Sequence, residues 1–398
     1  MAEMYDVIIA GAGPGGATAA YFLGEAGRRV LVLEKETLPR YKPCGGGLST
    51  RFLEEQFPFS FDPLIERRVK SIRYTLDGRS VSVPLRDRMM GMVMRDRFDA
   101  HILAHARAEV RQGWAARAVT EMPDRVIVEV RDGRVVEGRY LIGADGANSV
   151  VARSVGLRRG KTMAAAIEAE VPVPPEVMRR FADGPVILFG DVGLGYLWVF
   201  PKREHLSVGI AALHPRPGEL QATLARAMTR YGVSLEGVSL HGHPLPIYTR
   251  REPIATSRTL LVGDAAGLVD PLTGEGIRLA IKSGRLAAQA LVAEHPDRYP
   301  GMIHRQIGMC HTFGLGLAQF FYHHPRGCFM LGVRNPFATR AFIDLLSDQA
   351  DYPKVILRVL GSLPAYLITE GVAALAGLLG GPERRRRLRR AVYSGASD

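Results

Sequence analysis

The strongest constraint on the fold is a glycine-rich turn that follows the first apolar segment of the chain. A run rich in β-branched residues, 5–10, precedes the turn, an alanine-rich run, 17–26, follows it, and a second apolar run covers 29–33. This order predicts a strand, a helix and a second strand, joined by a right-handed crossover. The turn at 11–16 has the pattern G-x-G-x-x-G, and the candidate cofactor contacts in it are Gly11, Gly13, Pro14, Gly15 and Gly16.

Each glycine of the pattern has a physical reason. The first allows a tight turn, the second lets the backbone approach a pyrophosphate, and the third permits close packing of helix on strand. Free N–H groups at the helix N-terminus then face the phosphates. Glu34 ends the second strand, where a carboxylate can accept hydrogen bonds from ribose hydroxyls, and Lys35 follows it. Because strand, helix and terminal acid are all in place, we predict a Rossmann-type dinucleotide site here.

Segments of this type recur along the chain, and β-rich stretches separate them. Buried-strand patterns end at residues 143 and 262, and hairpin patterns flank the pairs 77–78 and 132–133. Helical patterns cover 95–110, 219–231 and 276–293, and most of the chain after about residue 300. We therefore predict an α/β protein with a discontinuous dinucleotide-binding domain, an inserted antiparallel-sheet substrate domain and a helical C-terminal region. The predicted boundaries are 1–70, 95–163 and 250–300 for the first, 71–94 and 164–249 for the second, and 301–398 for the third.

Charge and cysteine content narrow the classes of protein. The chain of 398 residues has a formal net charge of +12 but no nucleic-acid motif. Three cysteines favour a reducing cytoplasm over a disulfide framework, and the N-terminus has no secretory pattern. We predict a cytoplasmic protein with no nucleic-acid partner and no metal site.

An apolar segment and an arginine run are adjacent near the C-terminus. Residues 355–381 are largely apolar but contain Arg358, Pro364 and Glu370, so a membrane-spanning helix is a poor interpretation. An interfacial or tunnel-covering helix pair suits the pattern better. The arginines at 384–387, 389 and 390 could bind anionic headgroups. We expect peripheral membrane contact through this region, and a packed lobe with a solvated basic tail is the alternative.

A second strand–turn–helix segment identifies the dinucleotide. Residues 260–267 form a buried-strand pattern that ends at Asp264, and Pro271, Gly274, Gly276 and Ile277 lead into a helix. The segment resembles the second FAD fingerprint of the para-hydroxybenzoate-hydroxylase-like flavoproteins. That resemblance implies that Asp264 binds the flavin ribityl chain. It also implies that Gly274–Ile277 lie against the isoalloxazine, where a helix N-terminus stabilises negative charge.

Two further motifs match the same group of flavoproteins. Residues 143–149, with Asp145 and Gly146, resemble its middle motif, which packs near the dinucleotide and is implicated in pyridine-nucleotide use. Arg95 opens a predicted helix and matches the arginine that reaches FAD in that group, whereas an ordinary surface arginine is the alternative. Together the motifs imply a Rossmann-type FAD-binding domain of the para-hydroxybenzoate-hydroxylase-like type.

The segment Tyr41–Leu48 narrows the choice among flavoenzymes. It reads Tyr-Lys-Pro-Cys-Gly-Gly-Gly-Leu, and its three consecutive glycines let the backbone approach a flat ligand. The Cys44 thiol is mostly protonated at neutral pH and could donate a proton beside a flavin. For an isolated cysteine, a buried structural role is more common. The Lys-Pro-Cys-Gly-Gly sequence, however, strongly resembles the geranylgeranyl reductase family, whose members hydrogenate isoprenoid double bonds.

A second segment, at 195–201, resembles the Y-x-W-x-F-P motif of the same family. Alternation puts Tyr196, Trp198 and Phe200 on one face of a strand, which suits a prenyl chain, although such faces are also common in plain cores. Flavin-dependent halogenases have a related W-x-W-x-I-P stretch, but no counterpart of the Lys-Pro-Cys motif. The resemblance covers most of residues 4–290 and fades in the C-terminal hundred residues.

The family resemblance implies an FAD-dependent reductase that saturates double bonds of a geranylgeranyl or related isoprenoid chain. Cys44 would donate the proton, or shape the pocket around the flavin ring, and NADPH or reduced ferredoxin would supply electrons. The headgroup stays open among a diphosphate, a chlorophyll precursor, a quinone and a glycerophospholipid. A class A flavin monooxygenase or halogenase and an isoprenoid carrier without turnover are the alternatives. The implied cofactor contacts in this part of the chain are Cys44, Gly45 and Gly46, and the implied substrate contacts are Gly47, Tyr196, Trp198, Phe200 and Pro201.

Overall fold

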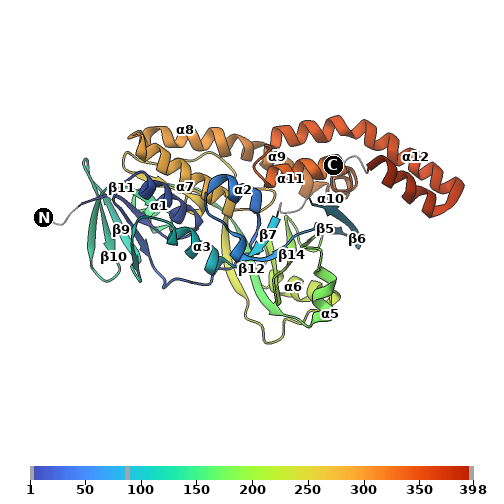
Figure 1. Ribbon diagram of the computed structural model, residues 1–398, viewed down its shortest axis with the longest axis horizontal. Helices are drawn as coiled ribbons and strands as arrows, with labels where there is room; N and C mark the ends of the chain where they lie inside the picture. The colour runs from blue at the N-terminus through green and yellow to red at the C-terminus, as the bar shows by residue number, and fades with distance from the viewer. Residues whose placement is uncertain (1–3, 86–89, 394–398) are drawn as a thin grey trace.

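Three β-sheets organise the chain, which the computed structural model describes over residues 4–85 and 90–393. The first sheet lies at one end of an elongated molecule and the long helix α12 at the other (Figure 1). The strands are β1 (Tyr5–Ala10), β2 (Val30–Glu34), β3 (Gly47–Ser49), β4 (Ile65–Arg68), β5 (Ser71–Leu76), β6 (Arg79–Pro84), β7 (Met90–Val93), β8 (Glu109–Gln112), β9 (Ala116–Glu121), β10 (Val126–Val130), β11 (Val135–Gly143), β12 (Thr162–Pro172), β13 (Val186–Phe189), β14 (Gly195–Pro201), β15 (His205–Leu213), β16 (His241–Ile247) and β17 (Thr259–Leu261).

The α-helices lie between these strands and then dominate the end of the chain. The helices are α1 (Pro14–Glu25), α2 (Thr50–Gln56), α3 (Arg95–Ala104), α4 (Val150–Ser154), α5 (Pro175–Met178), α6 (Glu219–Arg230), α7 (Ile277–Val292), α8 (Tyr299–Ile303), α9 (Met309–His323), α10 (Pro325–Cys328), α11 (Pro336–Leu346) and α12 (Tyr352–Tyr393).

The first sheet has the strand order β8-β2-β1-β11-β10-β9, and β17 also pairs with β11. Strand β1 is parallel to both β2 and β11, with Val7 opposite Val30 on one side and Tyr140 on the other. The predicted strand–helix–strand unit is therefore confirmed. Helix α1 packs directly on α7. The two helices approach so closely at Gly284 that a Cβ there would lie only 2.2 Å from the Gly15 carbonyl oxygen.

The second sheet has the order β16-β12-β15-β14-β13-β5-β6 and is antiparallel except between β13 and β5. Alternation along β14 separates its two faces. Leu197 and Val199 pack into a core that includes Leu220 and Leu224 of α6. The alternate residues face the other way, toward the C-terminal helices. A small third sheet, β3-β7-β4, holds the end of the loop that contains Cys44.

The helix predicted over 95–110 is too long. Helix α3 ends at Ala104, and Glu109–Gln112 instead form β8, which pairs in parallel with β2. The parallel pairing with β2 outweighs the helical periodicity, because strand pairing is a tertiary contact that a sequence window does not contain. The two hairpins are confirmed, and the first turns at Asp77 and Gly78, which both have positive φ.

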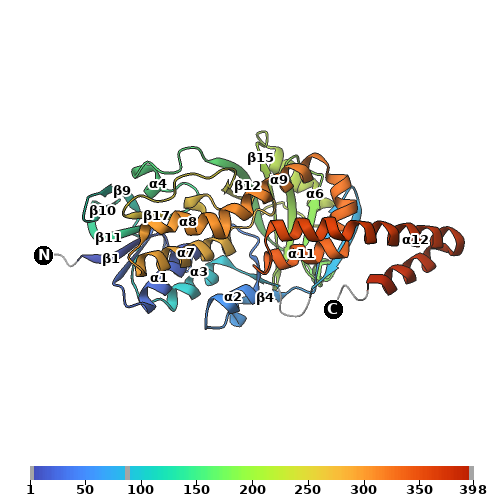
Figure 2. The ribbon, with the colours of Figure 1, turned by 90° about the horizontal axis from the view of Figure 1, so that it is seen from above.

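The C-terminal helices α9, α11 and α12 run along one side of the second sheet (Figures 1 and 2). Instead of the helix pair expected within 355–381, the single helix α12 covers this range. The chain doubles back only near the end of α12, and within the described part of this helix Gly381 has a positive φ of 76°. By length and composition alone, Tyr352–Ala376 could cross a membrane, although the charged residues and a proline in this range argued against a spanning helix. In the arginine run after it, Arg387 is exposed, and the other side chains lie outside the described part.

Candidate active site

The turn between β1 and α1 leaves little space for a side chain at Gly11, Gly15 and Gly16. A Cβ on Gly16 would lie 1.9 Å from the Gly11 carbonyl oxygen, and one on Gly15 would lie 3.2 Å from the Ala280 carbonyl oxygen. Gly11 has a φ of 105°. Helix α1 begins at Pro14 after Gly13, whose lack of a side chain leaves the first N–H groups available to an anion. The turn therefore fits the pyrophosphate of a dinucleotide.

A carboxylate and a guanidinium lie beside this turn. The Glu34 carboxylate, 3% exposed, accepts the backbone N–H of Ala12 at 2.8 Å. Arg40, which sequence reasoning missed, donates to Asp99 at 3.0 Å and keeps Nη1 buried without a partner in the described residues. A buried unpaired guanidinium N–H requires an acceptor, and a phosphate oxygen would satisfy it. Lys35 does not join this group, because its side chain is 69% exposed.

Arg95 is buried rather than on the surface. Its guanidinium donates to both Asp99 carboxylate oxygens at 2.8 Å. Burial opposes its charge, but Asp99 and a hydrogen bond with the Cys44 thiol raise the pKa of Arg95 overall. Arg95 and Arg40 thus hold the buried Asp99 between them, and Arg95 links the start of α3 to the Cys44 loop.

The middle motif, 143–149, packs against the glycine turn, and its Asp145 bonds to residues at the start of α4. A Cβ on Gly11 would lie 2.4 Å from the Ala144 carbonyl oxygen. Asp145 accepts hydrogen bonds from the Ser149 hydroxyl at 2.5 Å and the Val150 N–H at 2.6 Å, so it caps α4. Gly146 has a φ of 81°. The structure thus gives Asp145 a helix-capping role.

Asp264 lies just after β17 and faces a lysine–histidine pair. Its Oδ2 is 3.7 Å from Nε2 of His243, and that nitrogen is 2.8 Å from Nζ of Lys42. Burial by itself would raise the pKa of Asp264, but the nearby His243 imidazole and the charges of Lys42 and Arg95 lower it below the usual value. Burial also lowers the pKa of Lys42. The ionised Asp264 can accept hydrogen bonds from hydroxyl groups such as those of a ribityl chain.

Asp270, which the sequence does not single out, holds the loop before α7. Its Oδ1 accepts the N–H groups of Leu272 at 2.9 Å and Thr273 at 2.8 Å. The Tyr352 hydroxyl, from α12, donates to its two oxygens at 2.8 and 3.0 Å. The C-terminal region therefore helps to fix the loop that is predicted to lie against the isoalloxazine. The predicted residues in this loop and at the start of α7 are Pro271, Gly274, Gly276 and Ile277.

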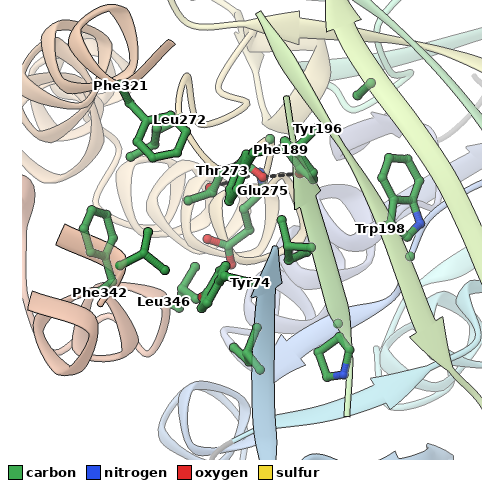
Figure 3. A pocket seen from close by; sticks show the side chains of 18 of the residues that line it. Tyr74, Phe189, Tyr196, Trp198, Leu272, Thr273, Glu275, Phe321, Phe342 and Leu346 are labelled. Atoms are coloured by element: carbon green, nitrogen blue, oxygen red, sulfur yellow. Dashed lines mark hydrogen bonds between the residues drawn. The ribbon is translucent and has the colours of Figure 1, made fainter. Parts of the chain in front are cut away.

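A cavity of about 720 Å³ begins at the Cys44 loop and extends between the second sheet and the C-terminal helices. Figure 3 shows Tyr74 and Phe189 on its sheet side and Phe321 and Phe342 on its helix side. The structure thus brings the predicted flavin loop, the Cys44 loop and the aromatic strand to one space. The predicted residues that line it are Cys44, Gly45, Gly46, Gly47, Tyr196, Trp198, Phe200, Gly274, Gly276 and Ile277.

The aromatic residues of β14 share one face, as alternation predicts. The Tyr196 hydroxyl donates to the Thr273 carbonyl oxygen at 2.5 Å, which ties the strand to the loop before α7 (Figure 3). Phe200 packs so closely on Gly45 that a Cβ there would lie 2.7 Å from its ring. Pro201 does not line the cavity. Lys202, after it, is fully buried and donates to the carbonyl oxygens of Gly45 at 2.6 Å and Val93 at 2.8 Å.

Helices α9 to α12 form the far wall of the cavity, although this part of the chain carries no motif. Their lining residues follow helical spacing, which is the signal that could have revealed them. The stripes are Leu317, Phe320, Phe321 and His324 on α9 and its end, and Ile356, Val359, Leu360 and Leu363 on α12.

Known proteins resemble this chain in sequence and in structure. Residues 4–55 and 78–192 match the FAD binding domain family. A menaquinone reductase of Mycobacterium tuberculosis is 32% identical over 335 residues, which cover 76% of this chain and 80% of that protein. A geranylgeranyl diphosphate reductase of Rhodobacter capsulatus is 30% identical over 306 residues, covering 73% and 75%.

Solved structures extend the similarity to the C-terminal region. A geranylgeranyl bacteriochlorophyll reductase-like protein of Thermoplasma acidophilum superimposes with a TM-score of 0.76 and 25% identity, over 91% of this chain and 96% of that chain. A flavin-dependent brominase superimposes with a TM-score of 0.69 and 20% identity, over 87% and 94%. At that identity the brominase shows a shared fold alone.

Proposed function

Because the chain belongs to the geranylgeranyl reductase family of FAD-dependent oxidoreductases, we propose that it hydrogenates carbon–carbon double bonds of a geranylgeranyl or related isoprenoid chain. The observation that carries this proposal is the apolar cavity of about 720 Å³, which starts at Cys44 and Gly274 and is walled by aromatic and aliphatic side chains. A long apolar chain would bury its surface there, and burial is favourable at about 0.8 kcal/mol per CH₂ group.

Different residues of the chain would bind the cofactor and transfer the proton. The Gly11–Gly16 turn, Arg40 and Asp264 would hold FAD, which when bound and reduced supplies the hydride. The Cys44 thiol would donate a proton to the second alkene carbon. The apolar walls exclude water from the reacting double bond.

The cavity also indicates where the headgroup lies. Its described lining residues include no lysine or arginine, so a diphosphate or other charged headgroup would be costly to bury there. Phe320, Leu331 and Leu360 line the cavity and are also 58%, 41% and 57% exposed, so the cavity reaches the surface between α9, the helical turn that follows α10, and α12. We therefore infer that the headgroup stays at this mouth while the prenyl chain enters.

The mouth lies on an apolar surface of α12, whose Leu357 and Ile368 are 70% and 67% exposed. Exposed apolar surface of this kind is typical of membrane contact, and the nearby arginine run suits anionic headgroups. We propose a cytoplasmic enzyme that contacts the membrane peripherally through α12 and takes its substrate from the bilayer.

The electron donor would be NADPH or reduced ferredoxin, which must reach the flavin directly. The G-x-G-x-x-G turn at 11–16 is assigned to FAD. The sequence has no second turn of this kind after a strand that could bind NADPH separately.

The test is an anaerobic assay with dithionite-reduced enzyme and geranylgeranyl diphosphate, a prenylated chlorophyll precursor, menaquinone or an unsaturated isoprenoid glycerophospholipid. Mass spectrometry should show a gain of two mass units for each reduced bond. Oxygen incorporation in air would support a monooxygenase instead, and unchanged mass with every substrate would contradict the reductase.

A further inference from the structure

A buried carboxylate, outside every motif, lines the same cavity as Cys44. Glu168 lies in the middle of β12 and is 2% exposed. In the sheet it stands opposite Gly209 of β15 and His241 of β16. A carboxyl group in such a place is costly unless it is paired with a cation or is neutral.

The hydrogen-bond partners of Glu168 in the described residues are two hydroxyl groups and one other carboxyl group. The Tyr41 hydroxyl donates to Oε2 at 2.8 Å, and the Ser207 hydroxyl donates to Oε1 at 3.3 Å. Burial raises the pKa of Glu168, and its hydrogen bond with Glu170 and the charge of Glu170 raise it further. Glu168 is therefore held in its protonated form well above the usual pH range of a carboxyl group.

Behind Glu168 a route leads to solvent. A second hollow of about 300 Å³ is lined by Tyr41, Glu170 and His241, among others. Tyr41 is 42% exposed, and His241 lines both this hollow and the main cavity. Glu170 follows Glu168 on the same face of β12, and its Oε2 lies 2.8 Å from Nε2 of His205. Glu170 thus lines the outer hollow, and Glu168, two residues before it, lines the inner, apolar cavity.

We propose that Glu168 resupplies the proton that Cys44 gives up, and that Tyr41 and Glu170 return a proton to Glu168 from solvent. The inference rests on the proposed reductase function. In each cycle one alkene carbon gains a hydride from the reduced cofactor and the other gains the thiol proton. The Cys44 thiolate then takes the proton of the Glu168 carboxyl, and the resulting carboxylate regains one from water. One reductant and one solvent proton are consumed per bond.

The surroundings suit a proton donor rather than an ion pair. Lys202 and Lys42 are the nearby lysines, but the first is bonded to the Gly45 and Val93 carbonyl oxygens and the second to His243. Burial lowers the pKa of both, although acidic neighbours partly oppose the shift. The titratable groups around Glu168 are Tyr41, Lys42 and Cys44 from the loop, Glu170 from its own strand, Lys202 and His205 from the β14–β15 turn and β15, and His241 and His243 from β16.

The test variant is Glu168→Gln, which keeps the shape but cannot carry the proton. Glu204→Gln, at an exposed position in the turn between β14 and β15, is the matched control. Starting from protonated Cys44, the single-turnover rate should stay within about threefold of wild type, while the steady-state rate falls by roughly 100-fold. The steady-state rate of the wild type should fall as pH rises through the pKa of Glu168, and the variant should lose this dependence.

A second readout does not depend on activity. Infrared spectra of the wild type at neutral pH should contain the carbonyl band of a protonated buried carboxyl group, which Glu168→Gln removes and Glu204→Gln keeps. Absence of that band overturns the proposal. So does an equal loss of single-turnover and steady-state rates in Glu168→Gln, which would indicate a purely structural role. A wild type that saturates no prenyl substrate but shows the band would contradict the proposed reductase and leave the protonated acid in place.

Discussion

Replacement of Tyr352 by phenylalanine tests whether the C-terminal region holds the flavin loop. The hydroxyl is fully buried and donates to Asp270 at 2.8 and 3.0 Å. Burial and the charge of Asp270 raise the pKa of Tyr352 well above its usual value, so the hydroxyl stays a donor at all moderate pH values. Tyr352→Phe removes this donor and keeps the ring, which packs against Gly314.

The expected loss in the free energy of unfolding follows from the charge of the acceptor, Asp270. A hydrogen bond to a charged acceptor contributes about 1.5–3 kcal/mol, and the retained ring creates no cavity, so the free energy of unfolding should fall by that amount. Asp270 keeps the N–H groups of Leu272 and Thr273. If about 1.4 kcal/mol of the loss is expressed in this loop, the Kd for FAD should rise by about tenfold.

Urea unfolding would measure the free energy of unfolding. Titration of the apoprotein with FAD, followed by flavin fluorescence, would measure the Kd for FAD. Tyr366→Phe is the matched control, because its hydroxyl donates to the neutral Met330 carbonyl oxygen at 3.0 Å. That change should cost about 0.5–1.5 kcal/mol and leave FAD affinity unaltered. If Tyr352→Phe loses no more stability than the control and binds FAD normally, α12 does not brace the loop.

Four further predictions concern the cofactor, the thiol and the membrane. Gly16→Ala should abolish flavin absorbance in the purified protein, because its Cβ would lie 1.9 Å from the Gly11 carbonyl oxygen, whereas Gly316→Ala, in open space, should retain it. Arg40→Gln should raise the Kd for FAD by roughly tenfold through loss of a charged phosphate contact, and an unchanged Kd would place the phosphates elsewhere. Cys44→Ala should keep FAD but lower the rate of saturation by roughly 100-fold, and equal turnover would remove the thiol from the reaction. The protein should float with anionic liposomes, and glutamine in place of the arginines at 384–387, 389 and 390 should weaken this; a wild type that stays at the bottom of the gradient is not membrane-bound.

The sequence by itself determined the local units of the fold. The Gly11–Gly16 turn, the strand that ends near Asp264 and the hairpin at Asp77 and Gly78 follow from residues close together in the chain. Alternation likewise placed the β14 aromatic residues on one face. These predictions hold because tight turns, strand periodicity and helix starts depend on backbone geometry within a few residues.

Only the tertiary structure decided what these units meet. Arg40 and Asp99, Asp270 and Tyr352, and Tyr41 and Glu168 are separated by 59, 82 and 127 residues, so no sequence window contains both partners of any of these three pairs. The same holds for β8, which periodicity assigned to a helix. The C-terminal helices carry no motif, yet they close the cavity that begins at the predicted Cys44 loop. Their role could not be predicted because an apolar helical stripe shows that a face is buried or binds something apolar, but not which surface lies opposite it.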